Sequence, residues 1–440
     1  MFLVLIGVII TLYGFINYKK AFMLFLVYQV FWYYNAPLFS IGGKTLTAST
    51  GFTLIFFIMY FFYNHRLEQP RIKCPYMVPL LLVVFSAVAS CFTSQIGFTS
   101  ELTRTLSITI CPNVIVVWLM WNVIETKKDF FVLFKMLTVT MCLAAIFAVY
   151  EYSVQDNFLF NIKDEIEGGL SNYNNTLFNE SATMRGYRIY SFFEHPVGAG
   201  MCFGIYFAFV VTVVVKAKEK LPYQKLAIIT ALLCLPCVVF TKMRSVIVFA
   251  FLACLGFIDF KKTKFYQIIL LMGIGVAIAW PLISPHINLL LSIFDSKYSN
   301  DVGGSNLVMR LSQLEAVIRI MNESPISGLG VNITQARDTF TAGALAFESV
   351  WFEQMAQHGL IGVATTIVSL IYSIIVVPKR FNSKELVFFA LAYWVTYTIT
   401  CIPSFRLFLL YFVYFYFIKT SDSYLNQKEE YKRLRFVINR

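Results

Sequence analysis

Long runs of apolar residues recur along almost the whole chain. A transmembrane helix needs about 20 mostly apolar residues, and thirteen stretches of the sequence approach that length. They are residues 2–17, 21–40, 48–63, 76–93, 106–124, 130–150, 195–215, 225–242, 245–260, 265–284, 357–377, 386–402 and 404–418. The pattern predicts an all-α, polytopic membrane protein with about 12–13 transmembrane helices, forming a single integral membrane domain over residues 1–440. Because the first run lacks a basic start and a small-residue cleavage site, we expect a membrane span there rather than a signal peptide.

Two connections between these runs are long and polar. Residues 151–194 are rich in Glu, Asp, Asn and Gly, and residues 285–356 begin with a loose polar stretch. Within the second connection, apolar residues at helical spacing predict an amphipathic helix over about 306–322. Its expected apolar stripe consists of Leu307, Leu311, Leu314, Val317, Ile318 and Met321. Since polar loops carried on a rigid scaffold often hold functional residues, we place the function of the protein here.

Basic residues in the short connections predict how the chain is oriented. Every second connection is rich in Lys or Arg, as at Lys19-Lys20, Lys127-Lys128 and Lys261-Lys262, and the tail after residue 431 is also basic. Basic residues close to span ends remain on the cytoplasmic side. The two long polar connections are therefore expected outside the cell, and the C-terminus inside.

Composition supports a membrane protein and argues against nucleic acid as a partner. The 440 residues are 58% hydrophobic and only 14% charged, whereas a soluble domain has about a quarter charged residues. The net charge of +12 is spread over the inner connections, and a nucleic-acid site would gather it on one face. Cys234 and Cys237 have a CxxC spacing, but they lie within an apolar run, so we expect neither a redox nor a metal role.

Arginine is unusually frequent on the predicted outer side, whereas lysine dominates the inner side. The outer arginines are Arg104, Arg185, Arg188, Arg244, Arg310, Arg319, Arg337 and Arg406. Topology requires only positive charge, but the planar guanidinium also binds phosphate or carboxylate through two parallel hydrogen bonds. The outer arginines therefore indicate that an anionic group is recognised near the outer leaflet.

The arginines differ in how strongly they indicate a site. Arg319 has Glu315 and Glu323 four residues away on either side, which is typical of a solvated ion pair on a helix. Arg310 instead falls within the predicted apolar stripe, where a cation needs an anionic partner. Arg244 lies where two spans meet, although an arginine there can also reach up to lipid phosphates. Arg188 and, less strongly, Arg185 precede the seventh span and are further candidates.

Two acids and two histidines are candidates for proton transfer. Glu348 lies where the second long connection re-enters the membrane, and a carboxylate in such a place can act as a general base. Glu353 follows one turn later, and both acids also suit the positive N-terminal end of a helix. His195 and His358 each lie alone near the interface, where a structural hydrogen bond is the commoner role. No clustered metal-ligand motif is present, so we expect no metal and no cofactor.

Three segments together resemble the O-antigen ligase/polymerase superfamily of bacterial glycan assembly proteins. The first is Arg188-Ile-Tyr-Ser-Phe-Phe-Glu-His-Pro-Val-Gly-Ala-Gly200, and the second is Thr241-Lys-Met-Arg-Ser245, in which Met243 replaces the usual Ser. The third combines Arg310, Ser324-Pro-Ile-Ser-Gly-Leu-Gly330, Glu348-Ser349 and Gln357-His-Gly-Leu-Ile-Gly362. Ligases of this family carry His where this chain has Glu348, and chains with Glu-Ser at that point resemble the polymerase branch more closely.

The resemblance implies a metal-independent glycosyltransferase with a GT-C-type helical fold in the bacterial cytoplasmic (inner) membrane, its active site facing the periplasm or the exterior. The donor would be an undecaprenyl-diphosphate-linked oligosaccharide, and the product an O-antigen, capsule or exopolysaccharide. Arg188, Arg244 and Arg310, with Arg185, would bind the diphosphate, and Glu348 would be the catalytic base. A flippase and a chain-length regulator of the same pathway are the implied protein partners.

Three other interpretations remain open. The chain could be a ligase that transfers finished glycan to lipid A core or to protein. A flippase or transporter would instead place charged or broken helices near the middle of the membrane, often in repeated halves. A scaffold of an export complex would leave the outer arginines without a role.

Overall fold

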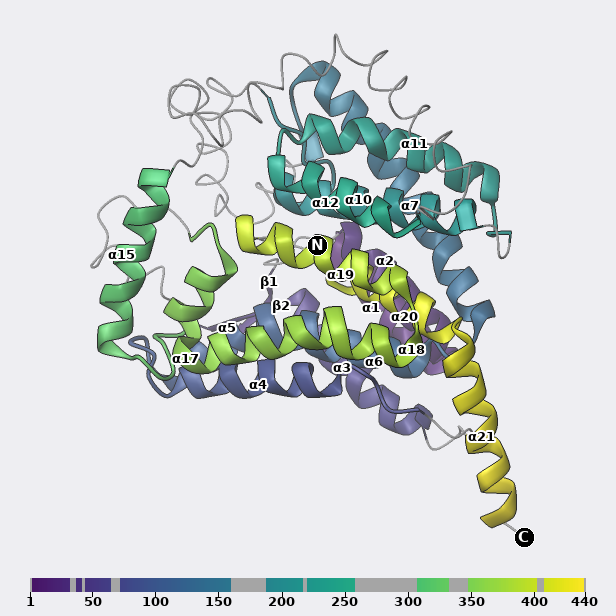
Figure 1. Ribbon diagram of the computed structural model, residues 1–440, viewed down its shortest axis with the longest axis horizontal. Coiled ribbons are helices and arrows are strands. Elements are labelled where there is room, and N and C mark those ends of the chain that lie inside the picture. The colour runs from purple at the N-terminus through teal and green to yellow at the C-terminus, as the bar shows by residue number, and fades with distance from the viewer. Residues whose placement is uncertain are drawn as a thin grey trace.

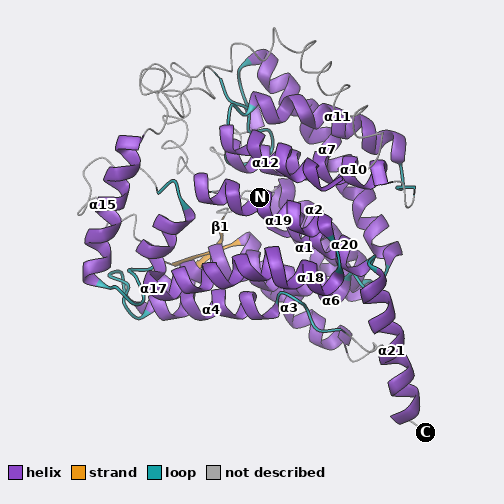
Figure 2. Cartoon of the chain, in the orientation of Figure 1, coloured by secondary structure: helices purple, strands orange, loops and turns teal. Residues whose placement is uncertain are grey.

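The computed structural model describes residues 2–31, 37–41, 44–64, 72–159, 187–216, 220–257, 307–331, 347–401 and 407–438. Within these ranges the chain is almost entirely helical, with one short antiparallel hairpin (Figures 1 and 2). The predicted all-α fold class is confirmed, and the hairpin is an addition to it. The predicted span 265–284 and most of the two long connections lie outside the described residues.

The N-terminal segment contains the hairpin. Its elements are α1 (Phe2–Ile16), α2 (Tyr18–Phe31), β1 (Pro37–Ile41), β2 (Lys44–Thr47) and α3 (Ala48–Asn64). The expected span over residues 21–40 was wrong at its end, because residues 37–40 belong to β1. Pro37 lacks the backbone N–H that a helix interior uses, and the residue before a proline disfavours helical backbone angles.

The next helices show how local sequence sets element ends. They are α4 (Met77–Cys91), α5 (Phe98–Thr105), the π-helix η1 (Leu106–Ile115), α6 (Val116–Val123) and α7 (Lys127–Val154). The π-helix contains Pro112, which removes one hydrogen-bond donor from the helix interior. Helix α7 starts with a capping box. The Thr126 hydroxyl oxygen accepts from the Asp129 backbone N–H at 3.3 Å, and the Asp129 carboxylate accepts from the Thr126 backbone N–H at 2.8 Å.

The remaining elements complete the bundle. The central ones are α10 (Pro196–Lys216), α11 (Gln224–Phe240), α12 (Arg244–Cys254) and the 3₁₀ turn η2 (Leu255–Phe257). The C-terminal ones are α15 (Leu307–Glu323), α17 (Val350–Ile371), the π-helix η3 (Tyr372–Val376), α18 (Val377–Phe381), α19 (Lys384–Ile399), α20 (Leu407–Lys419) and α21 (Asp422–Ile438). Helix α21, which was not predicted, projects away from the bundle (Figure 1).

The helices are arranged around α19 and α20. Helices α7, α10, α11 and α12 lie together in the upper part of Figure 1, and α4 and α17 lie side by side below. Helix α19 lies between them and packs against both α12 and α17. Helix α15 stands beside the N-terminal end of α17. The segment that follows α15, residues 324–331, is thereby brought against α17.

The described helices have the length and composition of a membrane protein. Four are long and apolar enough to cross a bilayer, namely Phe98–Val123, Lys127–Val154, Pro196–Lys216 and Val350–Phe381. Six shorter apolar helices accompany them. Large apolar side chains also face outward, for example Phe15 and Phe62, which are 73% and 74% exposed. Such side chains are suited to contact with lipid acyl chains rather than water.

Candidate active site

Glu348 lies just before α17, at a point where three segments meet. Its backbone N–H donates to the Gln313 side-chain oxygen of α15 at 3.2 Å. Its carbonyl oxygen accepts from the Cys401 backbone N–H, which follows α19, at 2.9 Å. The backbone of Glu348 is therefore fixed on both sides, and its carboxylate position is set by α15, α17 and the end of α19.

The Glu348 carboxylate pairs with Arg310. The Arg310 Nη2 atom lies 3.5 Å from Glu348 Oε2 and donates to the Ile399 carbonyl oxygen at 2.7 Å. The Arg310 and Glu348 side chains are 32% and 29% exposed, so both remain accessible to a ligand. The anionic partner that the position of Arg310 predicted is present. Since 3.5 Å is long for a charge-assisted hydrogen bond, the carboxylate keeps acceptor capacity for another donor.

The buried face of α15 differs from the predicted apolar stripe. Leu311 and Ile318 are 56% and 53% exposed, whereas Gln313 is 1% exposed. Val317 and Ile320 are buried against Leu329, Phe347 and Ala356. The stripe was wrong by part of a turn because Gln313 faces inward to bind the Glu348 backbone. On the outer face, Arg319 pairs with Glu315 at 2.6 Å, as expected.

Arg244 lies close enough to this pair to interact with it. It is the first residue of α12, and its charge interacts favourably with Glu348 and unfavourably with Arg310. Helix α12 packs against α19, whose end carries the Ile399 carbonyl that binds Arg310. Two arginines and one carboxylate, separated by up to 104 positions in the chain, therefore share one region.

Arg188 approaches the turn that precedes α12. Its Nη1 atom lies 3.8 Å from the sulfur of Met243. The neighbouring Ile189 N–H donates to the Phe240 carbonyl oxygen at 3.3 Å. The charge of Arg188 also acts on Lys242 and on His195. The structure thus brings Arg188, Arg244, Arg310 and Glu348 to one end of the bundle, joined through the turn at residues 240–244.

A buried carboxylate holds the Arg188 segment in place. Glu151, near the end of α7, accepts the backbone N–H groups of Tyr190 at 3.1 Å and Ser191 at 2.7 Å. It also accepts the Tyr187 hydroxyl at 3.1 Å. Ser191 has a φ of 53°, an uncommon value for a residue with a side chain. These hydrogen bonds offset that strain, and they fix the backbone after Arg188 and the side chain of Tyr187 before it.

His195 caps the start of α10 and is not placed as a base. Its Nδ1 atom accepts the Val197 backbone N–H at 3.1 Å, so the proton of the neutral ring must be on Nε2. Burial, followed by the charge of Arg188, lowers the pKa of His195 to about 4. The ring is therefore neutral at physiological pH, and its ring nitrogen Nδ1 is used in the cap.

Glu353 and His358 face the interior of the helix bundle. Glu353 accepts from the Cys401 thiol at 3.2 Å and from the Gln357 side chain at 3.2 Å. His358, 4% exposed, shares a hydrogen bond of 3.0 Å between its Nδ1 and the Ser90 hydroxyl. Both positions suit structural hydrogen bonds within the bundle, which was the commoner role expected for a lone histidine.

Helix α17 is broken at Gly359, and a loop fills the break. Gly359 has a φ of 59° and a ψ of −150°, values open only to glycine. The Leu329 and Gly330 N–H groups donate to the Ala356 and Gln357 carbonyls at 3.0 and 2.9 Å. In return, the Leu360 and Ile361 N–H groups donate to the Pro325 and Ile326 carbonyls at 3.0 and 3.1 Å. These four bonds fix the end of α15, and so Arg310, relative to α17.

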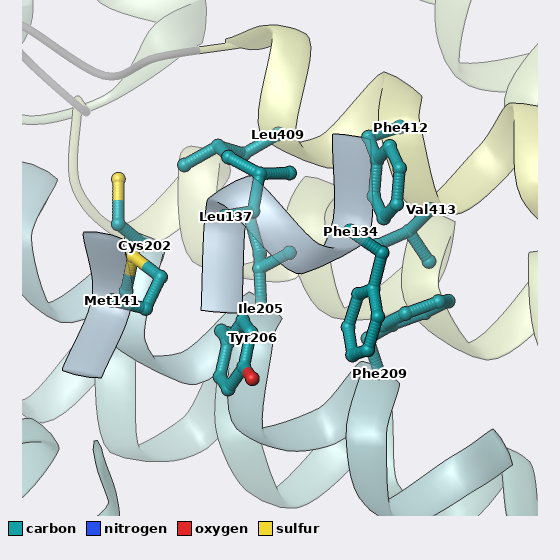
Figure 3. Close-up of a pocket in the computed structure, with 10 residues that line it drawn as sticks. All are labelled: Phe134, Leu137, Met141, Cys202, Ile205, Tyr206, Phe209, Leu409, Phe412 and Val413. Atoms are coloured by element: carbon teal, nitrogen blue, oxygen red, sulfur yellow. The ribbon is translucent and has the colours of Figure 1, made fainter. Parts of the chain in front are cut away.

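Some predicted site residues are not described. Arg185, Arg337 and Arg406 lie outside the described residues. Among the residues that are described, no group of three His, Cys, Asp or Glu side chains is placed to hold a metal ion. A cavity between α7, α10 and α20 is lined by apolar side chains and Tyr206 (Figure 3). The Tyr206 hydroxyl donates to Thr138 at 3.0 Å, and none of the charged residues above lines this cavity.

The sequence did not identify every residue that builds the site. Gln313 and Glu151 act through backbone N–H groups, and Cys401 contacts both Glu348 and Glu353. An acid near the end of an apolar span was a usable signal for Glu151, since a buried carboxylate needs partners. Neither Gln313 nor Cys401 belongs to a sequence motif that would have identified it. Lys242 was visible only as a neighbour of Arg244.

The comparison with known protein families covers much of this region. Residues 227–367 match the family model described as O-antigen ligase. The matched segment contains Arg244, Arg310, Glu348 and the break at Gly359, and it supports the superfamily that the motifs predicted. No curated protein matches the chain.

Proposed function

We propose that this chain, a membrane protein of the O-antigen ligase/polymerase superfamily, polymerises undecaprenyl-diphosphate-linked oligosaccharide repeat units on the outer face of the cytoplasmic membrane. The observation that carries the proposal is the accessible Arg310–Glu348 pair beside Arg244. Arginines offer charge and hydrogen bonds to a diphosphate leaving group, and the carboxylate offers a proton acceptor. The proposed reaction requires no metal ion, since the arginines can neutralise the negative charge of the leaving group.

The proposed reaction is one inverting displacement. A hydroxyl of the acceptor sugar attacks the anomeric carbon of the donor while Glu348 takes the hydroxyl proton. The new C–O bond forms on the face opposite the diphosphate, and the bond from the anomeric carbon to the diphosphate oxygen breaks. Arg244 and Arg310 stabilise the negative charge that develops on that oxygen. The products are a lengthened glycan on its lipid carrier and free lipid diphosphate.

The second candidate function is glycan ligation. The matching family is described as O-antigen ligase, and a ligase would use the same donor with lipid A core or protein as acceptor. Glu348 favours polymerisation, because the ligases that the motifs resemble carry a histidine there. A carboxylate and an imidazole can both accept the proton, so the acceptor must be identified by experiment.

The proposal can be tested by measuring the chain length of the surface glycan in a host strain that lacks its own copy of this protein. The strain would express the wild type, Glu348→Gln or Arg310→Lys, with chain lengths resolved by gel electrophoresis. Lysine keeps the charge but lacks the planar guanidinium, whose Nη2 atom donates to the Ile399 carbonyl and lies near Glu348. Both variants are expected to lose polymer by about 100-fold or more, which is the usual effect of removing one such group, and to leave single repeat units.

Arg319→Ala is the matched control, because Arg319 is on the same helix but 60% exposed and paired with Glu315. It is expected to leave chain length unchanged. Normal chain lengths in well-expressed Glu348→Gln and Arg310→Lys variants would contradict the site. Long chains that remain on the lipid carrier, without transfer to the final acceptor, would show a ligase instead. Donor held on the inner leaflet would show a flippase.

A further inference from the structure

Two pairs of polar side chains lie near one another on the neighbouring helices α17 and α19. On α17, the Gln357 side chain donates to Glu353 Oε1 at 3.2 Å. On α19, the ring centroids of Tyr393 and Tyr397 are 5.4 Å apart. Residues four apart share one face of a helix, and α17 packs against α19. The charge of Glu353 acts on both phenol groups, so the carboxylate lies close to the two tyrosines.

The carboxylate of Glu353 has hydrogen-bonding capacity left over. It accepts from the Gln357 amide and, at 3.2 Å, from the Cys401 thiol, which is a weak donor. Glu151, in contrast, accepts two backbone N–H groups and a phenol. In the described part of the chain, no cation forms an ion pair with Glu353. Since a carboxylate has about four acceptor positions, Glu353 can accept further hydroxyl groups from a ligand.

The two tyrosine rings are held in place and remain accessible. The ring centroid of Trp394, which is 8% exposed, lies 5.5 Å from that of Tyr393 and 6.1 Å from that of Tyr397. Both tyrosines and Glu353 are partly exposed. The face of an aromatic ring carries partial negative charge and attracts the C–H groups of a sugar ring. Aromatic rings beside a few polar groups therefore suit a neutral ligand rich in hydroxyls, whereas an anion would be repelled by Glu353.

Cys401 joins this group of side chains to the carboxylate proposed as the base. Its backbone N–H donates to the Glu348 carbonyl oxygen at 2.9 Å, and its thiol donates to Glu353. Trp351, between the two acids in the chain, donates through its Nε1 atom to the Thr398 hydroxyl at 3.3 Å. These contacts tie the start of α17 to the end of α19. A sugar bound at Glu353 is therefore adjacent to the Glu348 segment.

We propose that Glu353, Tyr393 and Tyr397 form the subsite that binds the acceptor sugar, and that this subsite selects an uncharged sugar over one that carries a carboxylate. The inference rests on the proposed function and adds to it the residues that recognise the acceptor. The tyrosine rings pack against the sugar ring, and Glu353 accepts hydrogen bonds from its hydroxyl groups. The reacting hydroxyl is then next to Glu348, which takes its proton.

The test separates the acceptor from the donor with two probes made from one repeat unit. The donor is the lipid-linked repeat unit extracted from a host strain that lacks this protein. Mild acid releases the same oligosaccharide from its diphosphate, so the released form can act only as an acceptor. The purified full-length chain in lipid nanodiscs is given both probes, and the water-soluble product is measured. Varying one probe at a time gives a separate KM for the acceptor and for the donor.

The main variants are Tyr397→Leu, which removes the ring, and Glu353→Gln, which removes the charge. Each is expected to raise the acceptor KM about tenfold, equivalent to about 1.4 kcal/mol, and to leave the donor KM within about twofold. Tyr397→Phe keeps the ring and is expected to change the acceptor KM by less than about threefold. The controls are Glu315→Gln and Tyr150→Leu, whose native side chains are exposed, and neither is expected to change either KM.

A purely structural role for these residues predicts a different result. Their substitution would then lower kcat or the thermal unfolding midpoint, with the acceptor KM unchanged or with both KM values raised equally. That result in both main variants would overturn the subsite. The structure of the released oligosaccharide, determined by mass spectrometry and NMR, tests the selectivity. An uncharged sugar is expected at its non-reducing end, and a terminal sugar with a carboxylate would contradict the proposal.

The proposed function fails by another outcome. A wild-type chain that forms no polymer from the lipid-linked repeat unit would remove the proposed function and the subsite with it. A wild type that forms polymer from the lipid-linked unit, but no product with the released oligosaccharide, would remove only the subsite. Acceptor recognition would then depend on the lipid rather than on the sugar.

Discussion

Arg310 shows how one side chain connects backbone and carboxylate at the site. Its Nη2 atom donates to the Ile399 carbonyl and lies near the Glu348 carboxylate. The carbonyl fixes the guanidinium, while the longer approach to Glu348 leaves the carboxylate partly available. The 3.5 Å separation therefore leaves the carboxylate able to accept a further hydrogen bond, as the proposed reaction requires.

His195 predicts a pH dependence of stability that one substitution should remove. Its pKa is about 4 in the folded chain and about 6.5 when unfolded. The unfolded state binds the extra proton between these values, so the contribution of the neutral ring is complete above about pH 6.5 and lost as the pH falls towards 4. The loss amounts to about 3 kcal/mol over that interval.

His195→Asn keeps an oxygen where Nδ1 caps the Val197 N–H but does not titrate. Thermal unfolding midpoints in detergent at pH 7.5 and pH 5 measure the difference. The wild type should lose more thermal stability than the variant between these pH values. Equal losses in the two proteins would show that His195 does not titrate as its surroundings indicate.

At the scale of elements, the break in α17 fixes the relation between α15 and the Glu348 segment. A Cβ added to Gly359 would lie 2.6 Å from the Ile326 carbonyl carbon and oxygen. Gly359→Ala should therefore disrupt the hydrogen bonds that tie residues 325–330 to α17. We expect it to destabilise the chain by more than about 3 kcal/mol, beyond the range for backbone strain alone, and to abolish polymer formation.

Gly97→Ala is the matched control for this substitution. Gly97 has a φ of 85° and a ψ of 147°, so alanine is strained there too, but a Cβ at Gly97 would have nothing within 4 Å. The expected cost at Gly97 is about 1–3 kcal/mol, with activity kept. Thermal midpoints and polymer formation measure both. If Gly359→Ala is no worse than Gly97→Ala, the loop at 325–330 does not brace α17.

The apolar pattern predicted most helices of the described chain, but not the contacts that assemble the site. Long apolar runs identify helices because both the lipid-facing and the buried surfaces of a membrane helix are apolar. Arg310 could be identified because it is a cation among apolar residues. The face of α15 was misplaced because the inward position of Gln313 depends on Glu348, 35 residues later. The pairing of β1 with β2 and the hydrogen bonds from the Tyr190 and Ser191 backbone to Glu151 also could not be predicted. They depend on backbone groups or on residues far apart in the chain, and local hydrophobic periodicity contains no information about either.

For the whole molecule, the distribution of basic residues predicts which side faces the cell exterior. Thr99 is exposed on α5, in a connection predicted to lie outside, and Lys220 is exposed in a connection predicted to lie inside. Seven of the nine native cysteines are buried and two are partly buried, so background labelling should be low. In intact spheroplasts, a membrane-impermeant maleimide should label Thr99→Cys, and it should label Lys220→Cys only after permeabilisation.

The two positions serve as controls for each other, and the unsubstituted chain measures the background. Labelling of Lys220→Cys in intact spheroplasts, with Thr99→Cys protected, would reverse the orientation. The α5 segment contacts the loop after α15, since the buried Glu101 accepts from the Ser94 hydroxyl at 2.8 Å and from the Val331 N–H. A reversed orientation would therefore place Arg188, Arg244 and Arg310 in the cytoplasm and contradict the proposed reaction with an acceptor outside the cell.

The assembly of the site from distant segments has a consequence for biosynthesis. Arg188 and Arg244 are translated well before Arg310 and Glu348, and the backbone groups that fix those two residues come later still, at Ile399 and Cys401. A nascent chain that has inserted only its first helices carries the cations without the carboxylate. If the proposed function holds, activity arises only when translation has passed Cys401, and unfinished chains in the membrane would not consume the proposed donor.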